Sequence, residues 1–269
     1  MNTNWLRSTT LFATVAAGTL LTLASAAHAF TFKTNYTLDP ALSGDNVWRG
    51  DILLQSVEYG GQVYSDFAFV NGANIIHNDP WTGGNTGAAS ADKGHHATIG
   101  ISQEFLTNEG AVAALGNSNL SSIIDGEDRG AFTIDLSFDK AVQDILVWER
   151  GINSAMDLQA IDAQGNLIGS VFHISKTDWA KAGFKMGTLE IGGNIQDVGS
   201  RGVSLADFGL TEGLIYGLRV SAQGTATYNG PDWKIVGVAG QEPEAVPEPA
   251  AMLGLLTVGA LGFVARKRG

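Results

Sequence analysis

Apolar residues that recur at every second position are the feature that most restricts the fold of this chain. In residues 132–138 Phe, Ile, Leu and Phe alternate with polar side chains, and residues 214–222 repeat the pattern. A period of two buries one face of a β-strand and leaves the other face in water. The 35 glycines in 269 residues exceed the usual share of roughly 7% and indicate many turns. Many short strands joined by many turns predict an all-β fold.

Turn signals divide the middle of the chain into further strands. Gly60 and Gly61 separate two apolar segments as a hairpin turn would, and residues 163–166 separate two more. These hairpins are predicted at residues 51–59 with 63–70, and at residues 158–162 with 167–172. Short apolar runs at residues 145–148 and 233–238 add two strands.

Helical and loop signals are weak by comparison. Residues 109–115 follow Thr107, a residue that can cap a helix, and residues 178–182 and 204–208 are each long enough for one turn. The Gly-rich residues 78–94 are predicted to form a long surface loop. Together these patterns predict one β-sandwich domain at residues 30–240, jelly-roll-like and with few short helices.

The N-terminal residues have the order of parts found in a secretory signal peptide. Arg7 precedes an uncharged, mostly apolar run, and Ala27 and Ala29 flank His28 in a small-x-small site. Signal peptidase is therefore expected to cut after Ala29, so that residues 1–29 form the signal peptide. The alternative is a buried N-terminal helix, which does not need the charge, apolar run and cleavage site in that order.

The C-terminal residues resemble a membrane-spanning segment. Residues 250–265 carry no charge and would reach roughly 24 Å as a helix, somewhat less than the ~30 Å core of a bilayer. Arg266, Lys267 and Arg268 follow this run, and the positive-inside rule keeps such cations in the cytoplasm. The sequence thus predicts an extracellular domain, a linker at 241–249, a transmembrane helix at 250–265 and a basic tail at 266–269.

Pro247, Glu248 and Pro249, then the apolar run and the basic tail, resemble the PEP-CTERM sorting signal of exosortase systems. The resemblance implies that an exosortase, a membrane-embedded cysteine transpeptidase, recognises these residues and cuts nearby. The protein would then be released or joined to a surface glycan or lipid. A plain membrane anchor is the alternative.

Blocks of the domain resemble the exosortase-dependent surface proteins of the XDP2 type, over most of residues 31–239. This second resemblance implies a surface protein without an assigned enzyme activity. The blocks are GDILLQSV, FVNGANIIHNDP, GAASADKG, NLSSIIDGEDRGAFTIDLSF, VWERGINS, QAIDAQGNLIGS, GVSLADFGL and GPDWKIVGV.

Charge and cysteine content exclude several classes of function. Residues 30–246 hold 12 Lys and Arg against 26 Asp and Glu, a net charge of −14, which argues against binding to nucleic acid. The chain has no Cys, so neither a disulfide framework nor a cysteine nucleophile or zinc ligand is available. The motifs G-x-S-x-G, H-E-x-x-H and the Walker A loop are also absent from the sequence.

Three carboxylates on one turn are the candidate metal ligands. Asp125, Glu127 and Asp128 could offer hard oxygen ligands to calcium, although the spacing fails the EF-hand pattern at its fifth and twelfth positions. The alternative is an acidic turn that forms a salt bridge to Arg129. The adjacent His95 and His96 would point to opposite faces of a strand, which suits a polar loop better than one metal.

Two further residues are candidates for contact with a glycan. Glu149 could be one of two glycosidase carboxylates, although no mate can be identified, and the alternative is an ion pair at a strand end. Trp81 lies in the Gly-rich loop after Asp79-Pro80 and could stack on a sugar ring. Trp148 and Trp233 fall in apolar strands and are predicted to be core residues.

The sequence therefore predicts an exported bacterial surface protein that is processed by exosortase and has no catalytic activity. It would contribute to the cell envelope or the extracellular matrix, with exopolysaccharide as a partner and no certain cofactor. The first alternative is a calcium-dependent carbohydrate-binding module that uses Trp81 and the acidic turn. The second alternative is a secreted glycoside hydrolase that uses Glu149.

Overall fold

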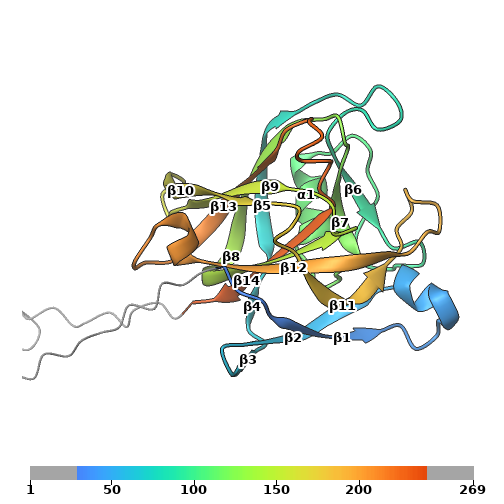
Figure 1. The fold of residues 1–269 in the computed structure, drawn as a ribbon, viewed down its shortest axis with the longest axis horizontal. Coiled ribbons are helices and arrows are strands. Elements are labelled where there is room, and N and C mark those ends of the chain that lie inside the picture. Colours follow the sequence, from blue (N-terminus) through green and yellow to red (C-terminus); the bar gives the residue numbers. More distant parts are fainter. Residues whose placement is uncertain (1–28, 241–269) are drawn as a thin grey trace, which may run out of the picture.

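Residues 29–240 are described here by a computed structural model, and they fold into antiparallel β-sheets with one short α-helix (Figure 1). This arrangement confirms the all-β sandwich expected from the alternating sequence pattern. The predicted linker, transmembrane helix and basic tail, together with residues 1–28 of the predicted signal peptide, lie outside the described residues. No helix within residues 29–240 is long and apolar enough to cross a membrane.

The smaller sheet has three strands in sequence order, β1-β2-β3. Gly60 and Gly61 connect β2 to β3 with φ values of +58° and +76°, a conformation that glycine adopts without strain, which confirms this hairpin turn. A short 3₁₀ helix, η1 (Gly44–Arg49), joins β1 to β2. The strands are β1 (Lys33–Leu38), β2 (Ile52–Tyr59) and β3 (Gln62–Tyr64).

The larger sheet has eleven strands, and most of them lie in the order β10-β9-β13-β8-β14-β7-β6. The remaining strands join this path at the side: β4 pairs with β14, β5 and β12 pair with β8, and β11 pairs with β12. The strands are β4 (Phe67–Ala68), β5 (Val70–Asn78), β6 (Ala89–Lys93), β7 (Ser122–Gly126), β8 (Phe132–Arg150), β9 (Met156–Ile161), β10 (Leu167–Ile174), β11 (Ala180–Met186), β12 (Gln196–Ser204), β13 (Ile215–Ala222) and β14 (Trp233–Ala239).

Strand β8 organises the molecule, because its two halves belong to different layers. The first half pairs with β5 and β13, and the second half pairs with β12 and β14. The layer of β5, β13, β9 and β10 thus packs over the layer of β12, β14 and β7, and the three-stranded sheet lies on the other side of that second layer (Figure 1).

Two hydrophobic cores fill the spaces between these layers. The larger core lies between the two halves of the large sheet and includes Phe132 and Trp233. The smaller core lies between the second layer and the three-stranded sheet and includes Ile52 and Trp148. Trp148 and Trp233 are 1% and 0% exposed, so both are core residues as predicted. Alternate residues of β14 and of the second half of β8 face the two cores, which explains why these segments are buried on both faces.

The helical predictions are partly confirmed. Helix α1 (Asn108–Leu115) begins after Thr107, whose hydroxyl accepts a hydrogen bond of 3.0 Å from the Gly110 amide. The 3₁₀ turn η2 (Leu205–Phe208) follows Ser204. The helical turn expected at residues 178–182 is wrong, because residues 180–186 pair with β12 as β11.

Three strand and loop boundaries also differ from the sequence predictions. Residues 132–138 and 145–148 were predicted as separate strands and instead form one strand of 19 residues. The expected strand at 63–70 breaks into β3, β4 and the start of β5. The surface loop expected at 78–94 ends early, because residues 89–93 form the buried strand β6. Small Ala and Ser side chains obscure this strand, since its burial comes from close packing and not from large apolar residues.

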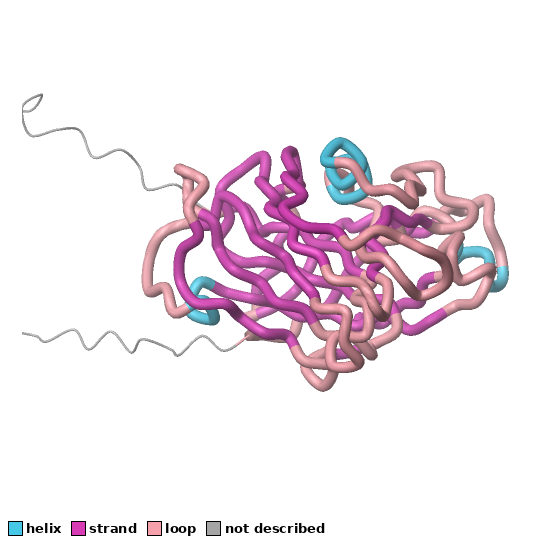
Figure 2. Tube along the Cα trace, turned by 90° about the horizontal axis from the view of Figure 1, so that it is seen from above, coloured by secondary structure: helices cyan, strands magenta, loops and turns pink. Residues whose placement is uncertain are grey.

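The two ends of the described chain leave the domain on the same side. In both views the described part of the chain begins and ends on the left of the molecule (Figures 1 and 2). The loop between β5 and β6 rises at the upper right of Figure 1, at the opposite end. A domain held through its C-terminal segment therefore presents the β5–β6 loop away from its point of attachment.

Candidate functional site

The β5–β6 loop and the segment before α1 enclose a groove of about 220 Å³. Trp81 and Phe105 both line it and are 41% and 70% exposed. Two exposed aromatic rings that line one groove make it a candidate contact surface. The remaining residues of the groove are Asn78, Asp79, Pro80, Ala88, Ala89, Glu104 and Leu106.

Hydrogen bonds at its base hold the Trp81 loop in one conformation. Asn78 both donates to the carbonyl oxygen and accepts from the amide of Ala89, at 2.9 and 2.8 Å. Asp79 makes a similar pair of contacts with Ala131, through its amide at 3.0 Å and its carboxylate at 2.9 Å. The Trp81 indole nitrogen donates to the Gly84 carbonyl at 3.1 Å, which orients the ring. The exposed ring is therefore preorganised, so that binding a ligand would cost little conformational entropy.

The acidic turn predicted to bind metal lies beside this loop. The Asn85 side chain donates to a carboxylate oxygen of Asp128 at 3.2 Å. Close to this contact, a Cβ atom on Gly130 would lie 1.0 Å from the carbonyl oxygen of Gly87. Only glycine fits at position 130, because the two segments approach so closely there. The structure therefore brings Trp81 and Asp128, which were predicted independently, into one region.

Carboxylates surround Glu127 at the same edge. Burial and, to a smaller extent, the carboxylates of Glu104, Asp232 and Asp128 raise the pKa of Glu127 to about 7. Glu104 is itself a residue of the groove. Asp232 is paired with Arg150, whereas Glu104, Glu127 and Asp128 form no ion pair within the described residues, which suits hydroxyl donors or a divalent cation.

Asp125, the third predicted metal ligand, has a different environment. It is buried at the end of β7, and Arg150 Nη2 donates to its carboxylate at 2.8 Å. The same guanidinium contacts Asp232 at 2.8 Å and Asp92 at 3.5 Å, and it also donates to the Thr188 hydroxyl. We call this group the Arg150 cluster: Asp92, Asp125, Arg150, Thr188 and Asp232. The salt bridge of the acidic turn is thus made with Arg150 and not with Arg129, the partner that was predicted.

The charges of the Arg150 cluster do not balance. One guanidinium faces three carboxylates, and burial raises the pKa of both Asp125 and Asp232 well above the usual range. The pKa of Arg150 is raised as well: burial acts to lower it, but Asp232 and Asp125 outweigh that effect. Oxygens of Asp92, Asp125 and Glu190 lie within 4.8 Å of one another. Because the guanidinium already supplies the positive charge that a metal ion would bring, we interpret the cluster as a structural ion-pair network. It links β6, β7, β8 and β14.

Glu149, the candidate glycosidase carboxylate, is 0% exposed. Its Oε2 accepts a hydrogen bond of 2.6 Å from the Ile152 amide, where Ile152 has a φ of +58°, and its Oε1 has no partner among the described residues. Burial raises the pKa of Glu149 well above its usual range. A sugar cannot reach this carboxyl, so its role is to hold the turn after β8.

His95 and His96 lie in a turn and not on a strand. Their rings meet edge to face with centroids 5.1 Å apart, and both side chains are exposed. The argument that a strand would direct them to opposite faces therefore does not apply. The polar loop that was favoured over a metal pair is where the residues lie.

The sorting residues are Pro247, Glu248, Pro249, Arg266, Lys267 and Arg268. They lie outside the described residues, as does Ala27 of the signal peptidase site, and Ala29 is the first described residue. A family model for the PEP-CTERM protein-sorting motif matches residues 245–268. The chain carries a PEP-CTERM sorting motif. This match confirms the resemblance of the Pro-Glu-Pro segment, the apolar run and the basic tail to that signal.

The PEP-CTERM motif carries a definite implication for where the chain goes. It marks a protein for export and for sorting at the membrane, with exosortase as the processing partner. No curated protein and no solved structure matches the chain at a significant level. The resemblance of residues 31–239 to the XDP2 type stays a prediction.

Sequence reasoning identified Trp81 and missed the groove around it. Phe105 and Leu106 form a short apolar pair in a polar segment, and nothing local relates Phe105 to an aromatic ring 24 positions earlier. The sequence signal was a large apolar residue in a mostly polar segment, which does not identify the partner ring. The Arg150 cluster was missed for the same reason, because its members come from five separate segments.

Proposed function

We propose that this PEP-CTERM protein is a non-catalytic component of the cell envelope or extracellular matrix that binds exopolysaccharide. The observation that carries the proposal is the preorganised groove between Trp81 and Phe105. Aromatic faces stack on the apolar faces of sugar rings, and the carboxylates of Asp79 and Glu104 can accept hydrogen bonds from sugar hydroxyls. The groove lies on the loop that points away from the C-terminal attachment (Figure 1).

A non-catalytic role is supported by the position of Glu149. Glycosidase carboxylates must flank a bond of the substrate, whereas Glu149 is enclosed by the core and engaged by a backbone amide. In the groove, the Asp79 carboxylate accepts a hydrogen bond from the Ala131 amide, and Glu104 is exposed at the surface. Binding is therefore the activity that the site supports best.

Replacing Trp81 with alanine should release the protein from exopolysaccharide. The ring supplies an exposed stacking face, so we expect its loss to weaken retention about tenfold, equivalent to about 1.4 kcal/mol. The unfolding free energy should change by less than about 0.5 kcal/mol, since the ring is not a core residue. Retention on exopolysaccharide isolated from the producing cells, measured by co-sedimentation, gives the comparison.

Val63→Ala provides the matched control for this variant. Val63 is 67% exposed on β3 and contributes nothing to the groove, so its replacement should leave retention unchanged. Phe105→Ala should behave as Trp81→Ala does. If Trp81→Ala and Val63→Ala bind equally well, the groove is not the binding site.

We also propose calcium as an accessory to the same site. The carboxylates of Glu104, Glu127 and Asp128 favour it, because none of them forms an ion pair within the described residues, whereas Asp232 is already paired with Arg150. A chelator should then weaken retention of the native protein, and Asp128→Asn should remove that sensitivity to the chelator. Retention that is identical with chelator and with added calcium would show that the groove works without the metal.

Processing by exosortase predicts a shortened protein at the cell surface. Intact-mass spectrometry of protein recovered from its native cells should give a mass that ends before residue 250, with or without an added glycan or lipid. The added mass would identify what the protein is joined to. A mass that extends through Gly269 would mean that the C-terminal segment is only an anchor.

A further inference from the structure

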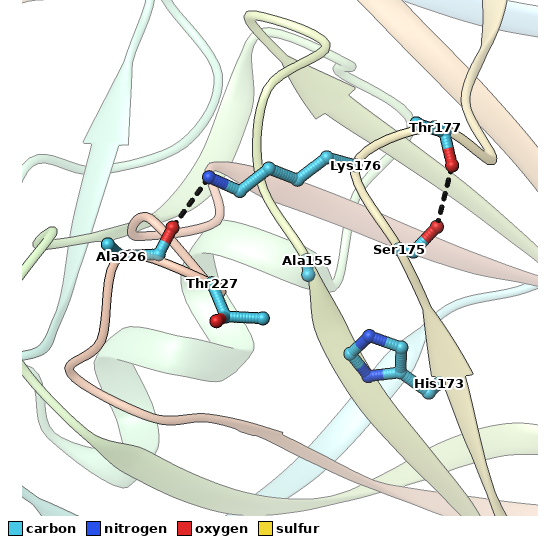
Figure 3. A pocket seen from close by; sticks show the side chains of 7 residues that line it. All are labelled: Ala155, His173, Ser175, Lys176, Thr177, Ala226 and Thr227. Atoms are coloured by element: carbon cyan, nitrogen blue, oxygen red, sulfur yellow. Dashed lines mark hydrogen bonds between the residues drawn. The ribbon is translucent and has the colours of Figure 1, made fainter.

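A second and larger pocket, of about 400 Å³, lies where β10 ends (Figure 3). Such a volume falls within the range of small-ligand sites, about 300–1,000 Å³. The close-up shows the Lys176 side chain crossing one side of the pocket towards Ala226, with the His173 ring on the opposite side. The residues that line it are Ala155, His173, Ser175, Lys176, Thr177, Ala226 and Thr227.

The polar groups of this pocket are a cation, an imidazole and hydroxyls. Lys176 donates one hydrogen to the Ala226 carbonyl at 2.7 Å and keeps two for a ligand. Ser175 and Thr177 share a hydrogen bond of 3.0 Å and retain further capacity, and Thr227 adds a third hydroxyl. None of the seven lining residues is acidic, although residues 30–246 carry more than twice as many anions as cations. The pocket thus favours a ligand with negative charge and several hydroxyls.

A chain of hydrogen bonds behind the pocket fixes the His173 ring. Its Nδ1 lies 2.6 Å from Asp157 Oδ1, and the Tyr228 hydroxyl donates to Asp157 Oδ2 at 2.5 Å. An ionised carboxylate only accepts hydrogen bonds, so Nδ1 carries the proton of this contact and Nε2 is left for a ligand. Burial and Asp157 raise the pKa of Tyr228 to about 12, so its hydroxyl stays protonated and remains a donor. Both carboxylate oxygens of Asp157 are thus occupied by contacts with the protein.

Two closed turns make the walls of the pocket rigid. In the first, the Ser175 amide donates to the Asp178 carboxylate at 2.8 Å, and the Asp178 amide returns to the Ser175 carbonyl at 3.0 Å. In the second, the Tyr228 amide donates to the Thr225 carbonyl at 3.0 Å. The contact from Lys176 to Ala226 joins the two turns across the pocket. A ligand would therefore meet polar groups that are already placed, which lowers the cost of binding.

From this geometry we propose that the pocket binds an acidic sugar, a uronate unit, by its carboxylate and its ring hydroxyls. Lys176 pairs with the carboxylate, while His173 Nε2 and the hydroxyls of Ser175, Thr177 and Thr227 contact the ring. This site is separate from the groove at Trp81, which has acidic side chains and suits a neutral sugar. The domain would then hold two glycan sites, one for a neutral and one for an acidic sugar, whereas the proposed function requires only the first.

Titration of the purified full chain with D-glucuronate tests the assignment. Amide shifts in an NMR spectrum should move at residues 173–177 and 225–228 and saturate, while D-glucose at the same concentration should bind at least tenfold more weakly. Lys176→Gln and His173→Gln should each weaken glucuronate binding at least tenfold. Lys181→Gln removes a cation on β11 that is 81% exposed, and it should leave binding unchanged.

Each other outcome overturns the proposal. Equal binding of glucose and glucuronate would show that the pocket does not prefer a negatively charged ligand. Equal losses of affinity in the Lys176 and Lys181 variants would show that binding depends only on the net charge of the protein. Saturation by inorganic phosphate without saturation by glucuronate would show an oxyanion site that does not take a sugar. Trp81→Ala must leave glucuronate binding intact, so failure of this site and failure of the groove are distinguished.

Discussion

Replacing Arg150 with methionine should lower the unfolding free energy of the domain by about 3–5 kcal/mol. The variant leaves Asp92, Asp125 and Asp232 together without the guanidinium, and the side chains of Asp92 and Asp125 are each only 4% exposed. Buried carboxylates that lose their only cation must take up protons or draw in water, and both responses cost free energy. Urea unfolding followed by tryptophan fluorescence would measure the loss.

Arg219→Met is the matched control for this experiment. Arg219 also forms a two-pronged contact with a carboxylate, at 2.6 and 2.8 Å from Asp135, but its side chain is 30% exposed. Solvent screens this pair, so its loss should cost about 1 kcal/mol or less. If the Arg150 variant is too unstable to purify, Asp125→Asn provides a milder test, because the guanidinium then still pairs with Asp92 and Asp232. Equal losses for Arg150→Met and Arg219→Met would mean that burial gives the cluster no special weight.

Glu149→Gln should stabilise the domain at pH 8 and change little at pH 4. Burial raises the pKa of Glu149 in the folded protein, so the folded state holds a proton that the unfolded chain releases above about pH 4.3. The native protein therefore loses stability as the pH rises from that value towards the folded-state pKa, and it carries no such penalty below it. Glutamine keeps the acceptor for the Ile152 amide and does not ionise. Each unit of pKa shift removed corresponds to about 1.4 kcal/mol.

Thermal unfolding of both proteins between pH 4 and pH 8 would test the sign and the size of this effect. Glu58→Gln is the control with the opposite sign, because hydrogen bonds from Lys33 and Asn35 lower the pKa of Glu58 at the surface. Its replacement should weaken the domain slightly at pH 8 and not at pH 4. A Glu149→Gln variant that is less stable than the native protein at pH 8 would show that the carboxylate is ionised and satisfied in the folded state.

Both predictions concern buried charged residues next to the end of β8. They distinguish residues that stabilise the fold from residues that are proposed to bind a ligand. The Arg150 cluster and Glu149 hold the strand ends on which the neighbouring loops rest. The two proposed glycan sites lie at the surface and can be altered with little loss of stability. Variants that unfold the domain, such as Arg150→Met, should therefore lose binding of both ligands. Trp81→Ala and Lys176→Gln should each lose binding of only one ligand.

Local patterns were sufficient for much of the fold and for the sorting motif. Alternation in residues 132–138 and 214–222 predicted strands because a β-strand directs successive side chains to opposite faces. The Gly60-Gly61 turn and the Thr107 cap are contacts between residues close in the chain, so their chemistry is visible in a short window. The PEP-CTERM signal is also a continuous segment, which is why residues 245–268 identified it without any tertiary structure.

Strand boundaries were harder to predict from the sequence, because they depend on which strands pair with each other. Residues 139–144 are more polar than their neighbours and predicted a break, yet strands on both sides of β8 carry it through as one element. The strand at 89–93 contains Ala, Ser, Asp and Lys, and only pairing with β7 makes it a strand. The energy of a strand comes largely from its cross-strand neighbours, and those are not local in sequence.

The sequence by itself determined the fold class, the sorting motif and the exposure of Trp81, since each depends on residues that are close together in the chain. Tertiary structure alone decided which side chains meet. Arg150 contacts Asp232, 82 positions away, Trp81 and Phe105 line one groove, and Lys176 contacts Ala226, 50 positions away. A site depends on distances between side chains in space, and the chain specifies those distances only through the packing of its sheets.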